Sequence, residues 1–525
     1  MITMKQSRSG SRGNPVCRRY FLFSALVTVG VAALLLVSLA VANGQDLELR
    51  EAVQKFILDN GLRILMVKRE CSPTVSFRVL FKTGGVDEPR GKAGLAHVLE
   101  HMMFKGTTTI GTKDYEKERI LLEKVDELAE RLLRVQDTER GSQEIELLRQ
   151  ALQAAQAEAE MYIQAGELNR IYDENGAVGF NAATWQDGTM YMVSLPSNRL
   201  ELWARLTTDS IANPVFRQFY RERDVVVEER RQRTETDPTG LLTEQFLAAA
   251  FIAHPYGRPT VGWLSDLERM VRSDLRQFYG RYYIPSNAVI AVMGGIQPEQ
   301  DIEIIRRYFS VIPPGKPPPQ VVTREPQQQG ERRVVVKFDA GPEVFVGYHK
   351  PTYPDRAAYV FDVIDILLTG GRTSRLFKRM VIQERLALSV KTGSSLPGNR
   401  YDNLFFFHGV PQVPHTSQDL ERILYEEIER LKTEAVTARE LQKVKNQVRV
   451  DFIYTLQSNE GLASQLVYYE AFFGGWERML EYPGMIESIT PEEIMEVAQT
   501  YLIEDNRTVA TLVKKAQETE MIRGE

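Results

Sequence analysis

The chain has 525 residues, of which 43% are hydrophobic and 26% are charged, and its formal net charge is −5. This length predicts two or three domains with enough core to fold without disulfide bonds, and the sequence contains only two cysteines. The acidic balance and the lack of a basic stripe argue against a nucleic-acid-binding protein.

The start of the chain has the composition of an export signal. Residues 1–19 carry five basic side chains and no acidic one, and residues 20–42 form an apolar run that ends in AVA. This order predicts a cleaved signal peptide over residues 1–42, but the run is also long enough for a membrane anchor. Both alternatives place the rest of the chain outside the cytoplasm. Cleavage after Ala42 would remove the five basic residues, taking the net charge from −5 to −10, and would leave Cys71 without a disulfide partner.

The next segments alternate between strands and helices. Residues 53–68 contain two apolar runs joined by Asn60-Gly61, which predicts a hairpin, and residues 74–85 predict a further strand. The segment GLAHVLEHMMFKG, residues 94–106, then reads as a helix.

This helix carries His97, Glu100 and His101. At about 100° per residue, the two histidines lie one turn apart on one face, with Glu100 at its edge. Two imidazoles in this arrangement can bind one Zn²⁺, leaving room for a third protein ligand and for a water that faces Glu100. The order H-x-x-E-H is a zinc-peptidase signature, although a histidine on a helix is more often packed in a core than bound to a metal.

A long polar tract follows at residues 115–169. Two runs of apolar residues at alternating spacings of three and four flank a short polar break around Gly141, which predicts an inserted helical hairpin. Either a gate or partner contact, or a solvated decoration that packs on itself, would account for it.

A third metal ligand is expected in the segment from Phe216 to Glu235. Glu222 and Glu229 are seven residues apart and fall on nearly the same helix face, whereas Glu228 points elsewhere. A carboxylate beside an apolar run is rarely buried without a cation, and zinc would supply one. The alternative is that these glutamates pair with neighbouring arginines on a solvated face.

A Pro- and Gln-rich stretch, residues 313–332, predicts a linker between two similar domains. The order of two strands and a helix begins again after it, so we expect domains at residues 45–312 and 333–525. The fold class expected is α+β, with each domain a mostly antiparallel sheet packed with helices.

Five segments together carry a resemblance to a known family. They are HVLEH (97–101), NAATWQDGTMY (181–191), ERDVVVEE (222–229), HPYG (254–257) and YYIPSNAV (282–289). From about residue 50 to residue 515 the chain resembles the pitrilysin/insulinase-type zinc metallopeptidases, in the branch of mitochondrial processing peptidase and its bacterial relatives. The resemblance implies the processing-peptidase fold, with a zinc-bearing first domain and a non-catalytic second domain.

The resemblance also implies a role for each site residue. His97, His101 and Glu229 would bind one Zn²⁺ per chain, Glu100 would be the general base, and Glu222 would support the site. The substrate backbone would add to the edge strand at Asn181, Ala182, Ala183 and Thr184, with Tyr191 also in the substrate site.

Two features depart from the family pattern. His101 and Glu229 are 128 positions apart, more than in relatives, and the hairpin at 115–169 accounts for the excess. The second half of relatives carries an Arg and, seven residues later, a Tyr, where this chain has Val381 and Leu388. A paralogous subunit that supplies this pair, or a homodimer, is therefore the expected partner.

The expected function is zinc-dependent hydrolysis of peptides or unfolded protein segments. The location would be the periplasm or the outer face of the inner membrane, with residues 20–42 as the anchor in the second case. Two alternatives remain: a non-catalytic scaffold or assembly subunit of the same fold, and an unrelated zinc hydrolase of small molecules.

Overall fold

The computed structural model describes residues 49–70, 72–138 and 143–515, and Gln54 onward belongs to one compact unit. The expected signal peptide or anchor at 1–42 lies outside the described residues. Among the helices that are described, none combines the length and the apolar character needed to cross a membrane.

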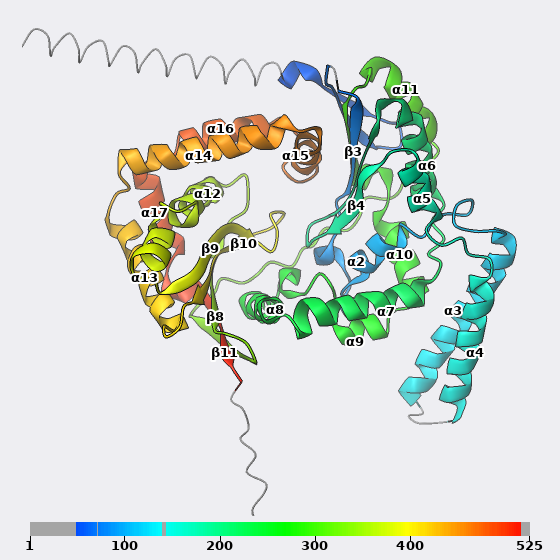
Figure 1. Ribbon diagram of the computed structural model, residues 1–525, viewed down its shortest axis with the longest axis horizontal. Coiled ribbons are helices and arrows are strands. Elements are labelled where there is room, and N and C mark those ends of the chain that lie inside the picture. Colours follow the sequence, from blue (N-terminus) through cyan, green and yellow to red (C-terminus); the bar gives the residue numbers. More distant parts are fainter. Residues whose placement is uncertain (1–48, 71, 139–142, 516–525) are drawn as a thin grey trace, which may run out of the picture. The chain divides into compact units, whose positions relative to one another are not determined.

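The described part of the first half contains a six-stranded sheet in the order β1-β2-β6-β3-β5-β4 (Figure 1). Its strands are β1 (Val53–Ile57), β2 (Arg63–Lys68), β3 (Thr74–Phe81), β4 (Val178–Thr184), β5 (Thr189–Pro196) and β6 (Ala288–Gly294). Strand β2 runs parallel to β6, while β3 is antiparallel to both β5 and β6. Every residue of β6 is buried, as expected for a strand in the middle of a sheet. Strand β4 pairs only with β5 and forms an edge.

The described part of the second half contains a five-stranded sheet in the order β7-β11-β8-β10-β9. Its strands are β7 (Arg332–Phe338), β8 (Glu343–Lys350), β9 (Ala387–Leu396), β10 (Asn403–Pro411) and β11 (Arg507–Lys514). Strand β7 runs parallel to β11, as β2 does to β6, and the other pairings of this sheet are antiparallel. The order matches that of the first sheet without β1. The predicted α+β class, with two similar domains of mostly antiparallel sheet, is therefore confirmed.

Helices cover both sheets. Those of the first half are α2 (Leu95–Met102), α3 (Tyr115–Thr138), α4 (Gln143–Glu160), α5 (Glu167–Glu174), α6 (Leu200–Ala212), α7 (Phe219–Arg230), α8 (Pro238–Ala250), α9 (Leu264–Glu268), α10 (Arg272–Tyr282) and α11 (Pro298–Phe309). Those of the second half are α12 (Arg356–Thr369), α13 (Ser417–Thr433), α14 (Ala438–Gln457), α15 (Asn459–Phe472), α16 (Arg478–Glu487) and α17 (Pro491–Tyr501). Residues 313–331 form neither helix nor strand.

Helices α3 and α4 pack against each other and make up the hairpin within 115–169 (Figure 1). A fully buried ion pair ties α3 to the first half, because Arg217 Nε lies 2.7 Å from Glu118 Oε1. The hairpin is thus fixed at its base.

The two halves exchange helices. Helix α8 of the first half packs on β7, β8 and β11 of the second sheet, where Phe246 stacks on Phe345. Helix α15 of the second half packs on β3 and β6 of the first sheet. Each sheet therefore buries one part of its surface under a helix from the other half.

Candidate metal centre

Helix α2 carries the H-x-x-E-H motif and begins at a glycine. Gly94 has a φ of +98°, and a Cβ there would lie 2.9 Å from the carbonyl oxygen of Val261. The carboxylate of Glu88 accepts hydrogen bonds from the backbone N–H groups of Gly94 (2.9 Å) and Ala96 (2.7 Å). Glu88 thus satisfies free donors at the start of the helix from outside it.

The buried face of α2, with Leu95, Val98, Leu99 and Met102 in the main core of the first half, sets how the motif is presented. His97 is buried beside these residues, and His101 and Glu100 are half-buried. Packing therefore holds the motif on one side of the helix.

Helix α7 brings Glu229 to the two histidines. Glu229 Oε2 lies 3.4 Å from His97 Nε2 and 3.6 Å from His101 Nε2. One ligand atom from each of the three residues falls within 4.8 Å of the others, and no other such group of three was found in the part of the chain that the structure describes.

The donor set fits a metal ion. Glu229 Oε2 is buried and has no hydrogen-bond partner among the residues that the structure describes, although it faces two imidazole nitrogens. A buried carboxylate oxygen is costly unless a donor or a cation satisfies it. Burial, helped by His101 and Arg233, lowers the pKa of His97 to about 3. A neutral imidazole is the form that binds zinc.

The three glutamates of α7 have different surroundings. Glu228 is exposed and pairs with Arg231, which is the solvated arrangement that the sequence left open. Glu222 faces inward, where its carboxylate lies 2.5 Å from Lys105 Nζ and 3.6 Å from His101 Nδ1. Burial alone would raise the pKa of Glu222, but hydrogen bonds from His101 and Lys105 outweigh it and lower that pKa. Glu222 is therefore placed to hold the ring of His101 through the nitrogen that faces away from Glu229.

Glu100 lies on α2, the helix that packs against the edge strand β4. Burial raises the pKa of Glu100, while a hydrogen bond from the Thr184 hydroxyl opposes the shift. Asn181 and Ala183 on β4 are exposed, and Ala182 between them is buried opposite Tyr191 of β5. The Tyr191 hydroxyl bonds that of Tyr283 at 2.9 Å. The structure thus brings the end of β4 to Glu100, and turns the hydroxyl of Tyr191 toward Tyr283.

The sequence analysis did not predict three residues that contribute to the metal centre, namely Lys105, Arg233 and Glu88. Lys105 and Arg233 each stand four residues after a site residue, His101 and Glu229, and this helical spacing was an available signal. Glu88 had no such signal, because it reaches α2 from a loop.

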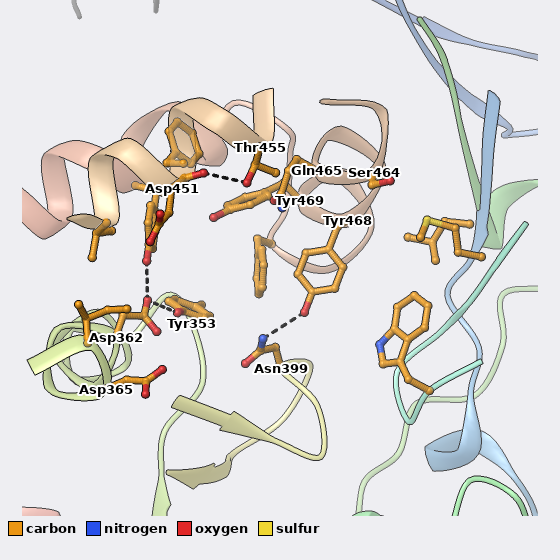
Figure 2. Close-up of a pocket in the computed structure, with 18 residues that line it drawn as sticks. Tyr353, Asp362, Asp365, Asn399, Asp451, Thr455, Ser464, Gln465, Tyr468 and Tyr469 are labelled. Carbon is orange, nitrogen blue, oxygen red and sulfur yellow. Dashed lines mark hydrogen bonds between the residues drawn. The ribbon is translucent and has the colours of Figure 1, made fainter. Parts of the chain in front are cut away.

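The two positions where the resemblance led us to expect Arg and Tyr hold no polar side chain. Val381 packs against the hydrophobic core of the second half, and Leu388 is exposed on β9. A cavity of about 510 Å³ lies elsewhere, lined mainly from α12, α14 and α15 (Figure 2). None of the predicted site residues lines it.

Two family models match this chain. The sequence model of the insulinase family (Peptidase family M16) matches residues 63–123 and 155–262, and that of the Peptidase M16 inactive domain matches residues 269–448. The gap between the first two ranges lies in the α3–α4 hairpin.

Several relatives align over most of their length. The zinc protease PqqE of Helicobacter pylori is 26% identical over 497 residues, covering 93% of this chain and 99% of that protein. An uncharacterized zinc protease of Mycobacterium tuberculosis is 26% identical over 461 residues, covering 86% and 91%. A crystal structure of a protease from Helicobacter pylori superposes with a TM-score of 0.74 at 25% identity, covering 88% and 99%.

Proposed function

Since the chain belongs to the insulinase family of peptidases, family M16, we propose that it is a zinc-dependent endopeptidase that cleaves peptides or unfolded protein segments outside the cytoplasm. One observation carries the proposal. A buried carboxylate oxygen of Glu229, without a hydrogen-bond partner, faces the Nε2 atoms of both motif histidines.

His97, His101 and Glu229 would hold the zinc, which when bound lowers the pKa of water to about 7 and polarises a peptide carbonyl. Glu100 takes the proton of the attacking water and returns it to the leaving amine, a transfer that its raised pKa favours. Glu222 and Lys105 keep His101 in one orientation.

The edge strand β4 would bind the substrate backbone. Because β4 pairs with β5 alone among the described strands, its outer edge is open to an added strand. The exposed residues Asn181 and Ala183 lie on this strand, and Thr184 ends it beside Glu100. A peptide added there would bring a carbonyl toward the metal centre.

A second chain would complete the site. Val381 and Leu388 provide no donor for the oxyanion that forms during hydrolysis. We expect a paralogous subunit with the Arg and Tyr pair, or a homodimer, to enclose the substrate. The apolar run at 20–42 supports a periplasmic location or an anchor on the outer face of the inner membrane.

The same missing pair favours the second candidate, a non-catalytic scaffold or assembly subunit. Zinc binding separates the two candidates, because a scaffold has no need of the metal.

Bound zinc and hydrolysis of quenched fluorescent peptides test the proposal, with and without a candidate partner subunit. We expect Glu100→Gln to keep zinc and lose turnover, and Glu229→Gln to lose both. Glu228→Gln is the matched control, since it removes a neighbouring carboxylate that is exposed. A wild type without zinc, and without activity with any partner, would leave the scaffold.

A further inference from the structure

A loop of the second half reaches into the first half, where it contacts Asp87 and Asp187. This loop, the clamp loop (residues 397–402), joins β9 to β10. The backbone N–H groups of Asn399 and Arg400 donate to Asp187 Oδ2 at 2.6 and 3.1 Å. The Tyr256 hydroxyl donates to Asp187 Oδ1 at 2.5 Å. Both oxygens of a fully buried carboxylate are therefore occupied, one of them by the opposite half.

A second buried carboxylate receives the side chain of the same loop. Arg400 Nη1 lies 3.1 and 3.0 Å from the two oxygens of Asp87, which is buried. Arg400 belongs to the clamp loop, so this ion pair exists only while the loop is docked. Undocking would leave the buried charge of Asp87 without its partner, which is costly.

The docking is close. A Cβ at Gly398 would lie 2.4 Å from Asp187 Oδ2, so the loop backbone approaches nearer than any other residue type allows without displacement. On the other side of the loop, the Asn399 side chain donates to the Tyr468 hydroxyl of α15 at 3.1 Å (Figure 2).

The two clamped carboxylates belong to the segments that build the metal centre. Asp187 lies in the turn after Thr184, at the end of strand β4, which packs against helix α2 of the motif. Asp87 precedes Glu88, which caps the helix of the motif. These segments are joined, since Gly85 N–H donates to the Trp185 carbonyl (3.2 Å) and Val86 N–H to that of Gln186 (3.0 Å).

We propose that Arg400 and Asp187 are positioning residues of the metal centre, through which the second half sets the end of the substrate strand against Glu100. The catalytic part of this inference rests on the proposed function. A shift of about 1 Å between reacting groups can cost about a hundredfold in rate. On this view the second half, though it carries no metal ligand, controls catalysis.

The alternative to a positioning role is that the clamp loop only stabilises the contact between the two halves. Another contact between the halves provides the comparison. Arg63 on β2 donates to the Glu470 carbonyl (3.1 Å) and contacts its carboxylate (3.4 Å). Strand β2 lies toward the opposite side of the sheet from β4. Arg63→Met thus weakens the contact between the halves without touching the clamp loop.

The test compares Arg400→Met, Gly398→Ala and Arg63→Met with wild type in the full protein. Hydrogen exchange is measured with and without zinc, zinc content is determined, and kcat and KM are measured on a fluorescent peptide. Gly398→Ala displaces the loop without changing any charge. If Arg400→Met does not fold, Arg400→Lys replaces it in the comparison.

We expect the two clamp variants to raise hydrogen exchange in residues 84–102 and 178–190, to keep one zinc, and to lower kcat/KM by about tenfold or more. Arg63→Met should leave exchange in those two segments unchanged and kcat/KM within about twofold. Unchanged exchange in the clamp variants, or the same rise in Arg63→Met, overturns the proposal. Since exchange needs no turnover, an inactive wild type would refute the proposed function and leave the structural part of the inference to be decided by exchange alone.

Discussion

The two halves share one strand order, but a carboxylate in the second half has hydrogen-bond donors that a carboxylate at the metal centre lacks. Helix α2 follows β3 as α12 follows β8, and both carry acidic side chains. In α12, Asp362 accepts hydrogen bonds from the hydroxyls of Tyr353 (2.5 Å) and Tyr482 (2.9 Å) (Figure 2). At the metal centre, Glu229 Oε2 has no donor. The same strand order therefore supports a metal centre in the first half because polar atoms there are left without partners, and not because of the fold alone.

Removal of the metal should have the largest effect, and it should act on the half that carries the metal centre. Zinc at a thousand times its Kd adds about 4 kcal/mol to the free energy of unfolding. We expect a chelator to lower stability by that order, to abolish hydrolysis, and to be reversed by added zinc. Calorimetry with and without chelator measures this, and Glu229→Gln should show no such response. A wild type that is equally stable in both states contradicts a metal site.

Truncation of Asp362 should affect the second half alone. Asp362→Ala leaves two tyrosine hydroxyls without their acceptor, which we expect to cost about 3 kcal/mol. Zinc content and kcat should not change. Urea unfolding measures the loss, with the exposed Asp451→Ala on the same cavity as the control. Loss of zinc in Asp362→Ala would mean that the two halves are not separable in this way.

Neutralising Glu222 should have an intermediate effect. Glu222→Gln removes the charge that faces His101 and Lys105, and such partners of a ligand are worth about 10- to 100-fold in metal affinity or activity. Competition with a zinc chelator measures the affinity. An effect no larger than that of Glu228→Gln would show that Glu222 does not support the site.

The smallest effect is expected from the pH dependence of Asp365, also on α12. Burial raises the pKa of Asp365 to about 6, although a hydrogen bond from the Thr392 hydroxyl opposes this rise. Because the folded pKa lies above the usual 3.8, the stabilisation is complete below that value and is lost as the pH rises through about 6. Asp365 faces the cavity, so we expect a change of only about 1 to 2 kcal/mol. Urea unfolding between pH 4 and 7 should show a flatter dependence for Asp365→Asn, and identical slopes would contradict this.

The sequence predicted the local part of the site, because the spacing of His97 and His101 is a property of one helix. Glu229 was reached through the resemblance, since no periodicity relates residues 128 positions apart. The choice among Glu222, Glu228 and Glu229 depends on how α7 packs. Neither the exchange of α8 and α15 nor the clamp loop was predicted, since both are contacts between distant segments.

The helix exchange has a consequence for synthesis of the chain. The face of β3 and β6 that α15 covers is formed early, but α15 ends only at Phe472. During translation this face, from which Arg78 and, on the adjacent strand β5, Ser194 bond Ser464 and Glu460 of α15, stays uncovered until nearly the whole chain has left the ribosome. The half that carries His97, His101 and Glu229 therefore completes the packing of its sheet only after most of the second half has been synthesised.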